Sequence, residues 1–243
     1  MMKRKHRTAT ALVGVGLTVI PVACASESSP SPKPEQVPAT STVPGASERF
    51  FPPIVRQALV QTREDAITYW TDRGVVTNLG NFVLLEGDTT IPNRCKESTF
   101  GENYESHPPK DIIKSGDRIQ PVHCSKGDTV IITPAGLELV LPEDVPLDSY
   151  KAVVAAKVIL RHESGHHAQQ ARGTYRTMAE GNDEKQADCY AGHMTALYSP
   201  VDYLPAVSFY GFKERVSGMD TMPDFNLGFN DVAGAGKICE SYQ

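Results

Sequence analysis

The pattern of apolar and polar positions predicts three helices and two short strands in this chain of 243 residues. Across residues 52–74, apolar side chains recur three or four positions apart, which predicts an amphipathic helix that ends near Gly74. The stretches NFVLLEG (81–87) and DTVIITP (128–134) are apolar and rich in β-favouring residues, and they predict two short strands. Residues 88–127 between them are polar, with Gly and Pro, and predict a long irregular loop.

The longest helical pattern covers residues 147–172. Asp148 or Ser149 can cap its N-terminus, because a short polar side chain accepts a hydrogen bond from the first free backbone amides. Residues 152–160 are apolar on nearly every side except at Lys157. A helix of this kind is expected to run through the hydrophobic core.

A further helix is predicted over residues 181–198. Asp183 and Gln186 have the spacing of a capping box at its start, and Pro200 follows its end. The pattern beyond Pro200 predicts no particular element. Taken together, these elements predict an α+β domain that is mostly helical, with a small sheet.

The first 25 residues have the composition of a secretory signal peptide. Four basic residues precede ATALVGVGLTVIPV (9–22), an apolar run that is too short to span a bilayer comfortably, and the small residues ACAS follow. The sequence therefore predicts an exported protein.

The cleavage site allows two interpretations. Ala23-Cys24 resembles a bacterial lipoprotein site, at which Cys24 would become a lipidated N-terminus that anchors the protein to the outer face of the cell membrane. Alternatively, Ala23 and Ala25 form an ordinary A-x-A site, which would discard Cys24 and release the protein. Residues 26–47 are rich in Ser and Pro and cannot bury enough apolar surface to fold, so they predict a disordered tether. A tether favours the lipoprotein interpretation, and it leaves residues 48–243 as the folded domain.

Composition and charge narrow the function. Hydrophobic residues make up 40% of the chain and charged residues 22%, which is typical of a globular domain. Removal of the first 25 residues takes away four of the 24 basic residues and none of the 29 acidic ones, so the mature chain has a net charge near −9. Such a chain lacks the basic surface that nucleic-acid binding requires.

Four cysteines remain in the predicted domain: Cys95, Cys124, Cys189 and Cys239. An even number in an exported chain indicates two disulfides, and four cysteines allow three pairings. Spacing alone does not choose among them. A link between Cys95 and Cys124 would fasten the long loop over residues 88–127, and it is the pairing that we expect there.

Three histidines and a glutamate fall within six positions of the segment LRHESGHHAQQ (160–170). Residues four apart share one face of a helix, so His162 and His166 are expected to point their imidazoles at the same place. Imidazole is a good ligand for Zn²⁺, and Glu163 would lie beside the metal as a proton acceptor, which is the H-E-x-x-H arrangement. The competing interpretation is a solvated polar turn at the end of a helix, but an apolar helix does not present three histidines without partners for them.

A catalytic zinc ion commonly has three protein ligands and one open position. Candidates for the third ligand lie downstream and comprise Glu180, Asp183, Glu184, Asp188 and His193. Glu184 and Asp188 share a helix face, so Glu184 could complete the ligand set while Asp188 accepts the distal N–H of a ligand histidine. His167 lies about 100° around the helix from His166 and is expected to pack rather than to bind the metal. Gly165 suggests close approach of another backbone, or room for a substrate.

The segments HESGHHAQQ (162–170) and EKQADCYAG (184–192) resemble the bacterial neutral zinc metallopeptidases. The resemblance extends more loosely over residues 50–243. It implies a zincin-like fold of the gluzincin type, in which the small sheet flanks the active-site helix. It also implies that His162, His166 and Glu184 bind one Zn²⁺ ion, that Glu163 is the general base, and that Cys189 pairs with Cys239.

These features predict an exported zinc metallopeptidase that hydrolyses peptide bonds with a zinc-activated water and Glu163 as the base. Tyr190 and His193 are candidate donors to the oxyanion. The strand at 128–134 could lie at a sheet edge and hold an extended peptide or protein substrate. Two alternatives stay open: a zinc-binding envelope lipoprotein that acts as a scaffold for partners with little turnover, and an amidase that acts on cell-wall peptides.

Overall fold

The computed structural model describes residues 49–75, 82–92, 112–124, 129–174, 178–179, 181–217 and 222–242. They belong to one compact unit, Val43–Gln243. The predicted signal peptide (1–25), the tether (26–47) and the lipidation site Cys24 lie outside the described residues and stay predictions. No helix in the described part of the chain is both long and apolar enough to cross a membrane.

The first helix, α1 (Pro53–Asp72), agrees with the predicted amphipathic segment. Its proline starts the helix, where the missing N–H costs nothing. Gly74, with φ of +68°, follows its end. The buried face of α1 carries Leu59, Tyr69 and Trp70, and these residues join the main hydrophobic core.

Two small sheets precede the long helix. The three-stranded sheet has the order β1-β5-β4, with β1 parallel and β4 antiparallel to β5; its strands are β1 (Phe82–Leu84), β5 (Thr129–Ile132) and β4 (Val122–Cys124). The other sheet is an antiparallel pair of β2 (Thr90–Pro92) and β3 (Ile112–Lys114). A short helix, α3 (Pro134–Val140), follows β5, and the Thr133 hydroxyl caps it by accepting from the Gly136 N–H at 2.8 Å.

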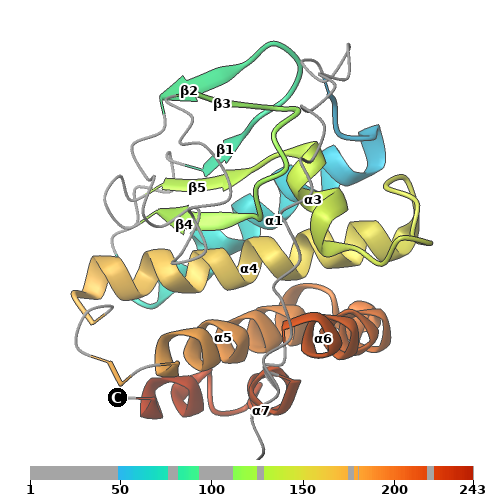
Figure 1. Cartoon of the computed structure of the whole chain (residues 1–243). Helices are drawn as coiled ribbons and strands as arrows, with labels where there is room; N and C mark the ends of the chain where they lie inside the picture. The colour runs from blue at the N-terminus through green and yellow to red at the C-terminus, as the bar shows by residue number, and fades with distance from the viewer. Residues whose placement is uncertain are drawn as a thin grey trace, which may run out of the picture. The chain divides into compact units, whose positions relative to one another are not determined.

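Two predictions about this region are wrong. The segment 88–127 is not wholly irregular, because β2, β3 and β4 fall within it. The strand predicted at 128–134 is β5, and it lies in the centre of its sheet rather than at an edge. The edge beside the long helix α4 is formed by β4 instead (Figure 1).

The long helix α4 (Tyr150–Arg172) confirms the strongest helical prediction. Ser149, one of the two predicted caps, accepts a hydrogen bond from the Ala152 N–H at 3.2 Å. Gly173, with φ of +72°, ends the helix. Residues from Ala152 to Gln169 are buried with one exception, Lys157, so the helix runs through the core as expected.

The next helix, α5 (Asn182–Tyr198), is also confirmed, but its predicted capping box is wrong. Gly181 occupies the N-cap position without a side-chain hydrogen bond, and the Gln186 side chain contacts other groups. Helical segments then follow where the sequence predicted none: η3 (Pro200–Asp202), α6 (Tyr203–Ser217), α7 (Met222–Asn230) and η4 (Lys237–Ser241).

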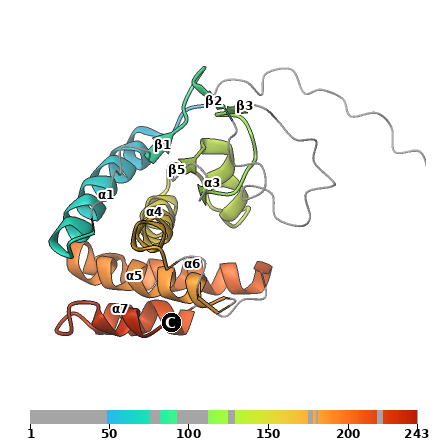
Figure 2. The same ribbon diagram turned by 90° about the vertical axis from the view of Figure 1, so that its left-hand side faces the viewer.

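The elements form layers around α4. Figure 1 shows the strands on one side of α4 and α5 on the other, with α7 beyond α5, and Figure 2 shows α1 alongside α4. Glycines allow close contacts between these helices. A Cβ on Gly165 of α4 would lie 2.9 Å from the Ala187 Cα of α5, and one on Gly228 of α7 would lie 1.8 Å from the Cys189 carbonyl oxygen. The molecule is thus α+β and mostly helical, as the sequence predicts.

Candidate metal centre

Two histidines of α4 and one glutamate of α5 converge on a common point. His162 and His166 lie one helical turn apart and are buried, and their Nε2 atoms are 3.0 Å apart. Glu184 lies in the first turn of α5, with one carboxylate oxygen 3.3 Å from His162 Nε2 and the other 3.4 Å from His166 Nε2. The structure therefore brings together the three residues that the sequence singled out as metal ligands.

The spacing of these atoms suits a small cation. Two ligand atoms that bind one zinc ion at about 2.0–2.1 Å with tetrahedral angles lie about 3.3 Å apart. The three separations between the ligand atoms, from 3.0 to 3.4 Å, lie close to that value. Among the described residues, His162, His166 and Glu184 form the one group of three such side chains that could hold a metal ion.

Gly165 explains how Glu184 reaches the two imidazoles. It lies between His162 and His166 on α4, and the absence of a side chain there lets the backbone of α5 approach at Ala187. Close packing of the two helices brings the first turn of α5 next to the histidines. Of the two roles that the sequence suggested for this glycine, the structure thus supports the close approach of another backbone.

The Asp188 carboxylate orients His162. Its Oδ1 atom lies 2.7 Å from His162 Nδ1 and also accepts a hydrogen bond from the Tyr210 hydroxyl at 2.6 Å. Because a carboxylate accepts hydrogen bonds, His162 Nδ1 carries the proton and Nε2 presents its lone pair to the centre. The predicted role of Asp188 thus agrees with its position in the structure.

His166 has its own partner on α4. Its Nδ1 atom lies 2.9 Å from Gln169 Oε1, one helical turn further along. With Nδ1–H donating to this oxygen, the Nε2 lone pair of His166 also points to the centre. Two imidazole lone pairs and a carboxylate then face one another, which is electrostatically unfavourable unless a cation lies among them. The chemistry of the donor set therefore fits a divalent metal ion.

The ionised form of the Glu184 carboxyl group is stabilised by His162 and His166. Burial by itself would raise the pKa of its carboxyl group, but when no metal ion is bound, protonated His162 and His166 can donate their Nε2–H groups to it, and these hydrogen bonds and charges hold that pKa well below its usual range. Glu184 is therefore an anion at neutral pH and can act as a ligand without first losing a proton.

Glu163 occupies the position of a proton acceptor. It is buried, and burial raises the pKa of its carboxyl group above the ordinary value, with Glu184 raising it further and the two histidines lowering it. Its carboxylate also accepts a hydrogen bond from the backbone N–H of His123, in the edge strand β4. The edge strand is thereby tied to the residue that would move protons.

His123 is a residue of this region that the sequence did not indicate. Its buried ring is stacked near His166, with the ring centroids 6.4 Å apart, and it meets the His167 ring edge-on at 5.9 Å. His167 also contacts Phe82, which agrees with the packing role expected for it. A three-residue strand gives too little periodicity for the sequence to place His123 here.

Tyr190 and His193, the two candidate oxyanion donors, make their observed contacts with groups outside the metal centre. The Tyr190 ring packs against Trp70, and its hydroxyl accepts from an Arg172 N–H at 3.1 Å. His193 lies nine residues after Glu184, about 180° around α5, and its Nδ1 is 2.9 Å from the Tyr69 hydroxyl. Burial lowers the pKa of His193 to about 4, so its ring is neutral at pH 7. The geometry gives the oxyanion role of these two residues no support.

Asp183 and Glu180, two other candidates for the third metal ligand, are not among the described residues that the structure groups around the centre. Asp183 is not part of the metal-binding group, and its backbone carbonyl accepts a hydrogen bond from Gln169 Nε2 at 2.8 Å. Glu180 lies outside the described residues. Of the residues that the sequence offered as the third metal ligand, Glu184 is the one that the structure groups with His162 and His166.

The structure contains a disulfide between Cys189 and Cys239, which the family resemblance implied. It joins α5 to the C-terminal segment η4. Cys189, its α5 member, directly follows Asp188 in the sequence. Cys124 is also disulfide-bonded. Its expected partner Cys95 lies outside the described residues, so that pairing stays a prediction.

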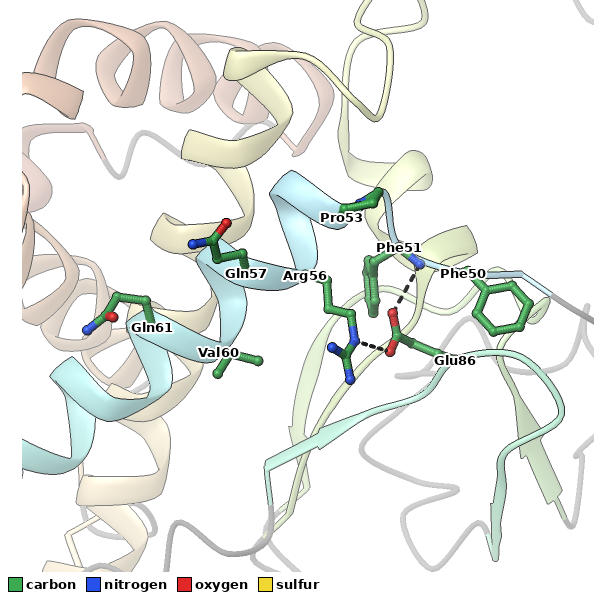
Figure 3. A pocket seen from close by; sticks show the side chains of 8 residues that line it. All are labelled: Phe50, Phe51, Pro53, Arg56, Gln57, Val60, Gln61 and Glu86. Carbon is green, nitrogen blue, oxygen red and sulfur yellow. Dashed lines mark hydrogen bonds and ion pairs between the residues drawn. The ribbon is translucent and has the colours of Figure 1, made fainter.

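A surface pocket lies elsewhere, at the start of α1 (Figure 3). It is lined by Phe50, Phe51, Pro53, Arg56, Gln57, Val60, Gln61 and Glu86. Its two charged residues bind each other, with Arg56 Nε 2.7 Å from Glu86 Oε2. None of the metal-site residues lines this pocket.

No protein-family model, curated protein or solved structure matches this chain. The assignment of function therefore depends on the site itself.

Proposed function

We propose that this protein is an exported, zinc-dependent peptidase of the neutral zinc metallopeptidase type with a zincin-like fold. One observation carries the proposal: two imidazole nitrogens and a carboxylate meet at separations of 3.0–3.4 Å, directly beside the buried Glu163. Three ligands and an adjacent acid–base residue are what a hydrolytic zinc site requires.

His162, His166 and Glu184 would hold the metal ion. A zinc ion bound there would supply Lewis-acid chemistry, polarising a carbonyl group and lowering the pKa of a water molecule. Glu163 would accept a proton from water and pass it to the leaving amine. Its raised pKa supports this role, because a general base works best when its pKa approaches the working pH.

The edge strand β4 offers a place for an extended substrate. One side of β4 pairs with β5, and among the described residues no strand pairs with its other side. An extended peptide can add to such an edge through backbone hydrogen bonds. Because β4 also donates a hydrogen bond to Glu163, a peptide bound along it would lie near the proposed base.

The cysteines support export. Disulfides persist in oxidising compartments, and both Cys124 and the Cys189–Cys239 pair are oxidised. Together with the signal-peptide pattern and the Ser/Pro-rich segment, they favour a protein at the outer face of the cell membrane, held there by a lipid on Cys24.

The test measures zinc content and peptide cleavage on the same samples. The purified exported chain is analysed by metal spectrometry and then incubated with a broad peptide library, cell-wall peptides included, with and without a chelator. We expect about one zinc ion per chain and cleavage that the chelator abolishes. The Glu163→Gln variant should keep its zinc and lose cleavage by a factor of about 10² or more.

The possible outcomes separate the hypotheses. Glu163→Gln with full activity would refute the base. Bound zinc without cleavage of any peptide would favour the scaffold lipoprotein, and cleavage of cell-wall peptides alone would favour the amidase. A wild-type chain that binds no zinc would refute all three.

A further inference from the structure

We propose that Gln169 and Gln186 are positioning residues for His166, and that the backbone carbonyl of Cys239 sets the direction of the hydrogen-bond chain that joins them. The inference rests on the proposed metal site and deepens it, because it links a ligand of that site to the disulfide-bonded C-terminal segment.

The chain runs from the ligand to the C-terminus in three hydrogen bonds. His166 Nδ1 lies 2.9 Å from Gln169 Oε1, and Gln169 Nε2 donates to Gln186 Oε1 at 3.1 Å. Gln186 Nε2 in turn donates to the Cys239 carbonyl oxygen at 2.8 Å. Residues from α4, α5 and η4 therefore act through one continuous path.

The direction of this path is fixed at its far end. A side-chain amide can rotate by 180° and exchange its donor for its acceptor, but a backbone carbonyl only accepts. Cys239 therefore requires the Gln186 nitrogen, which leaves the Gln186 oxygen for Gln169. Gln169 in turn offers its oxygen to His166, so in the neutral imidazole Nδ1 carries the proton and Nε2 presents its lone pair to a bound metal ion.

A second carbonyl reinforces the same orientation. Gln169 Nε2 also donates to the backbone oxygen of Asp183, at 2.8 Å. Asp183 immediately precedes the ligand Glu184, so this bond also holds the start of α5 against α4. Loss of Gln169 should therefore disturb the centre more than loss of Gln186.

Burial makes these bonds difficult to replace with water. The exposed fraction is 1% for Gln169 and 7% for Gln186, and the disulfide holds Cys239 beside α5. His162 has a separate support in Asp188 and Tyr210. The two ligand histidines are thus oriented by independent groups: the Asp188 carboxylate, which is charged, orients His162, and the neutral glutamine amides orient His166.

The experiment measures Zn²⁺ affinity by competition with a chelator, and the visible absorption of the Co²⁺-substituted protein, on the disulfide-bonded chain. Gln169→Leu should lower Zn²⁺ affinity about 10- to 100-fold, the usual effect of removing a partner of a ligand histidine, and should alter the Co²⁺ spectrum. Gln169→Glu keeps an oxygen acceptor opposite His166 but removes the amide that donates to Asp183 and Gln186, so it should recover only part of the lost affinity. Gln186→Leu should cause a smaller loss, about three- to tenfold.

Gln170→Leu is the matched control, because it changes the same residue type at the next position of α4, and it should bind both metals as the wild type does. Wild-type affinity in Gln169→Leu would overturn the proposal. If Gln169→Leu does not fold, as judged by circular dichroism, Gln186→Leu decides, and undiminished affinity there overturns the proposal. A wild-type chain without Zn²⁺ affinity would instead refute the proposed function, so the two failures are distinguishable.

Discussion

At the scale of single residues, the missing side chain of Gly165 determines how closely α4 and α5 pack beside the metal ligands. Alanine there would bring its Cβ to 2.9 Å from the Ala187 Cα and 3.2 Å from the Ala187 Cβ, so α4 and α5 would have to separate. We expect Gly165→Ala to destabilise the fold by about 1–3 kcal/mol, the usual cost of overpacking, and to weaken Zn²⁺ binding because Glu184 moves with α5. Chemical denaturation and chelator competition measure the two effects.

The control for this prediction is Gly211→Ala in α6. Apart from the adjacent backbone of its own helix, no atom of a described residue lies within 4 Å of the position that its Cβ would take. Alanine there should stabilise the fold by about 0.5–1 kcal/mol, since glycine is the poorer helix former. If Gly165→Ala stabilised the fold as much as Gly211→Ala does, the position of Glu184 would not depend on close packing at Gly165.

The sequence predicts the ligand residues well because their relations are local. The four-residue spacing of His162 and His166 fixes their shared direction on any helix, and the same spacing joins Glu184 to Asp188. The residues that hydrogen-bond to the ligand histidines or support those bonds could not be predicted from local spacing. The contact of Gln186 with Cys239 spans 53 residues, and Tyr210 lies on a helix that the sequence did not predict.

At the scale of elements, Asp202 joins η3 to α4. Its carboxylate is buried, 2.9 Å from Lys157 Nζ and 2.5 Å from the Tyr150 hydroxyl. Asp202→Asn leaves Lys157 without its counter-charge, and we expect it to lower the free energy of unfolding by about 2–3 kcal/mol at pH 7. Tyr150→Phe, which removes a single hydrogen bond, should cost about 1 kcal/mol.

The effect of Asp202→Asn should depend on pH. Burial by itself would raise the pKa of Asp202, but hydrogen bonds from Tyr150, Lys157 and Ser199 lower it below its usual range. A carboxyl group with a lowered folded-state pKa stabilises the fold above its unfolded pKa of about 3.9, and this contribution is lost as the pH falls through the folded value. The difference between wild type and variant should therefore be constant near pH 7 and shrink below about pH 4. A difference unchanged down to pH 2 would contradict the assignment.

Element predictions succeeded where periodicity was long and failed where it was short. The helices α1, α4 and α5 carry patterns of 17 residues or more. Strands β2, β3 and β4 have three residues each, too few for an alternating pattern. The central position of β5 depends on which distant strands pair with it, and hydrophobic pattern alone does not contain that information.

At the scale of the whole molecule, the Cys189–Cys239 disulfide closes the segment that contains α6, α7 and η4 onto α5. The two cysteines are 50 residues apart in sequence, and cross-links of that span stabilise a fold by about 4 kcal/mol in the chain-entropy model, within a usual range of about 2–5 kcal/mol. The double substitution Cys189→Ala and Cys239→Ala should lower the free energy of unfolding by that amount in guanidinium denaturation.

The same double variant provides a second measurement. If Gln186 acts through the Cys239 carbonyl, Gln186→Leu should reduce Zn²⁺ affinity less in the variant without the disulfide than in the wild type, because both changes interrupt one path. Strictly additive losses would show that the disulfide supports the fold without influencing the metal centre.

The order of residues along the chain has a consequence for biosynthesis. Every metal donor lies at or before Glu184, whereas two of the groups that support the donors, Tyr210 and the Cys239 carbonyl, come later in the chain. A chain that extended only as far as α5 would contain the ligands together with Gln169, Gln186 and Asp188, but without these two later supports. If the proposed metal site is correct, full metal affinity is therefore expected only after Cys239 has been joined to α5 by the disulfide with Cys189.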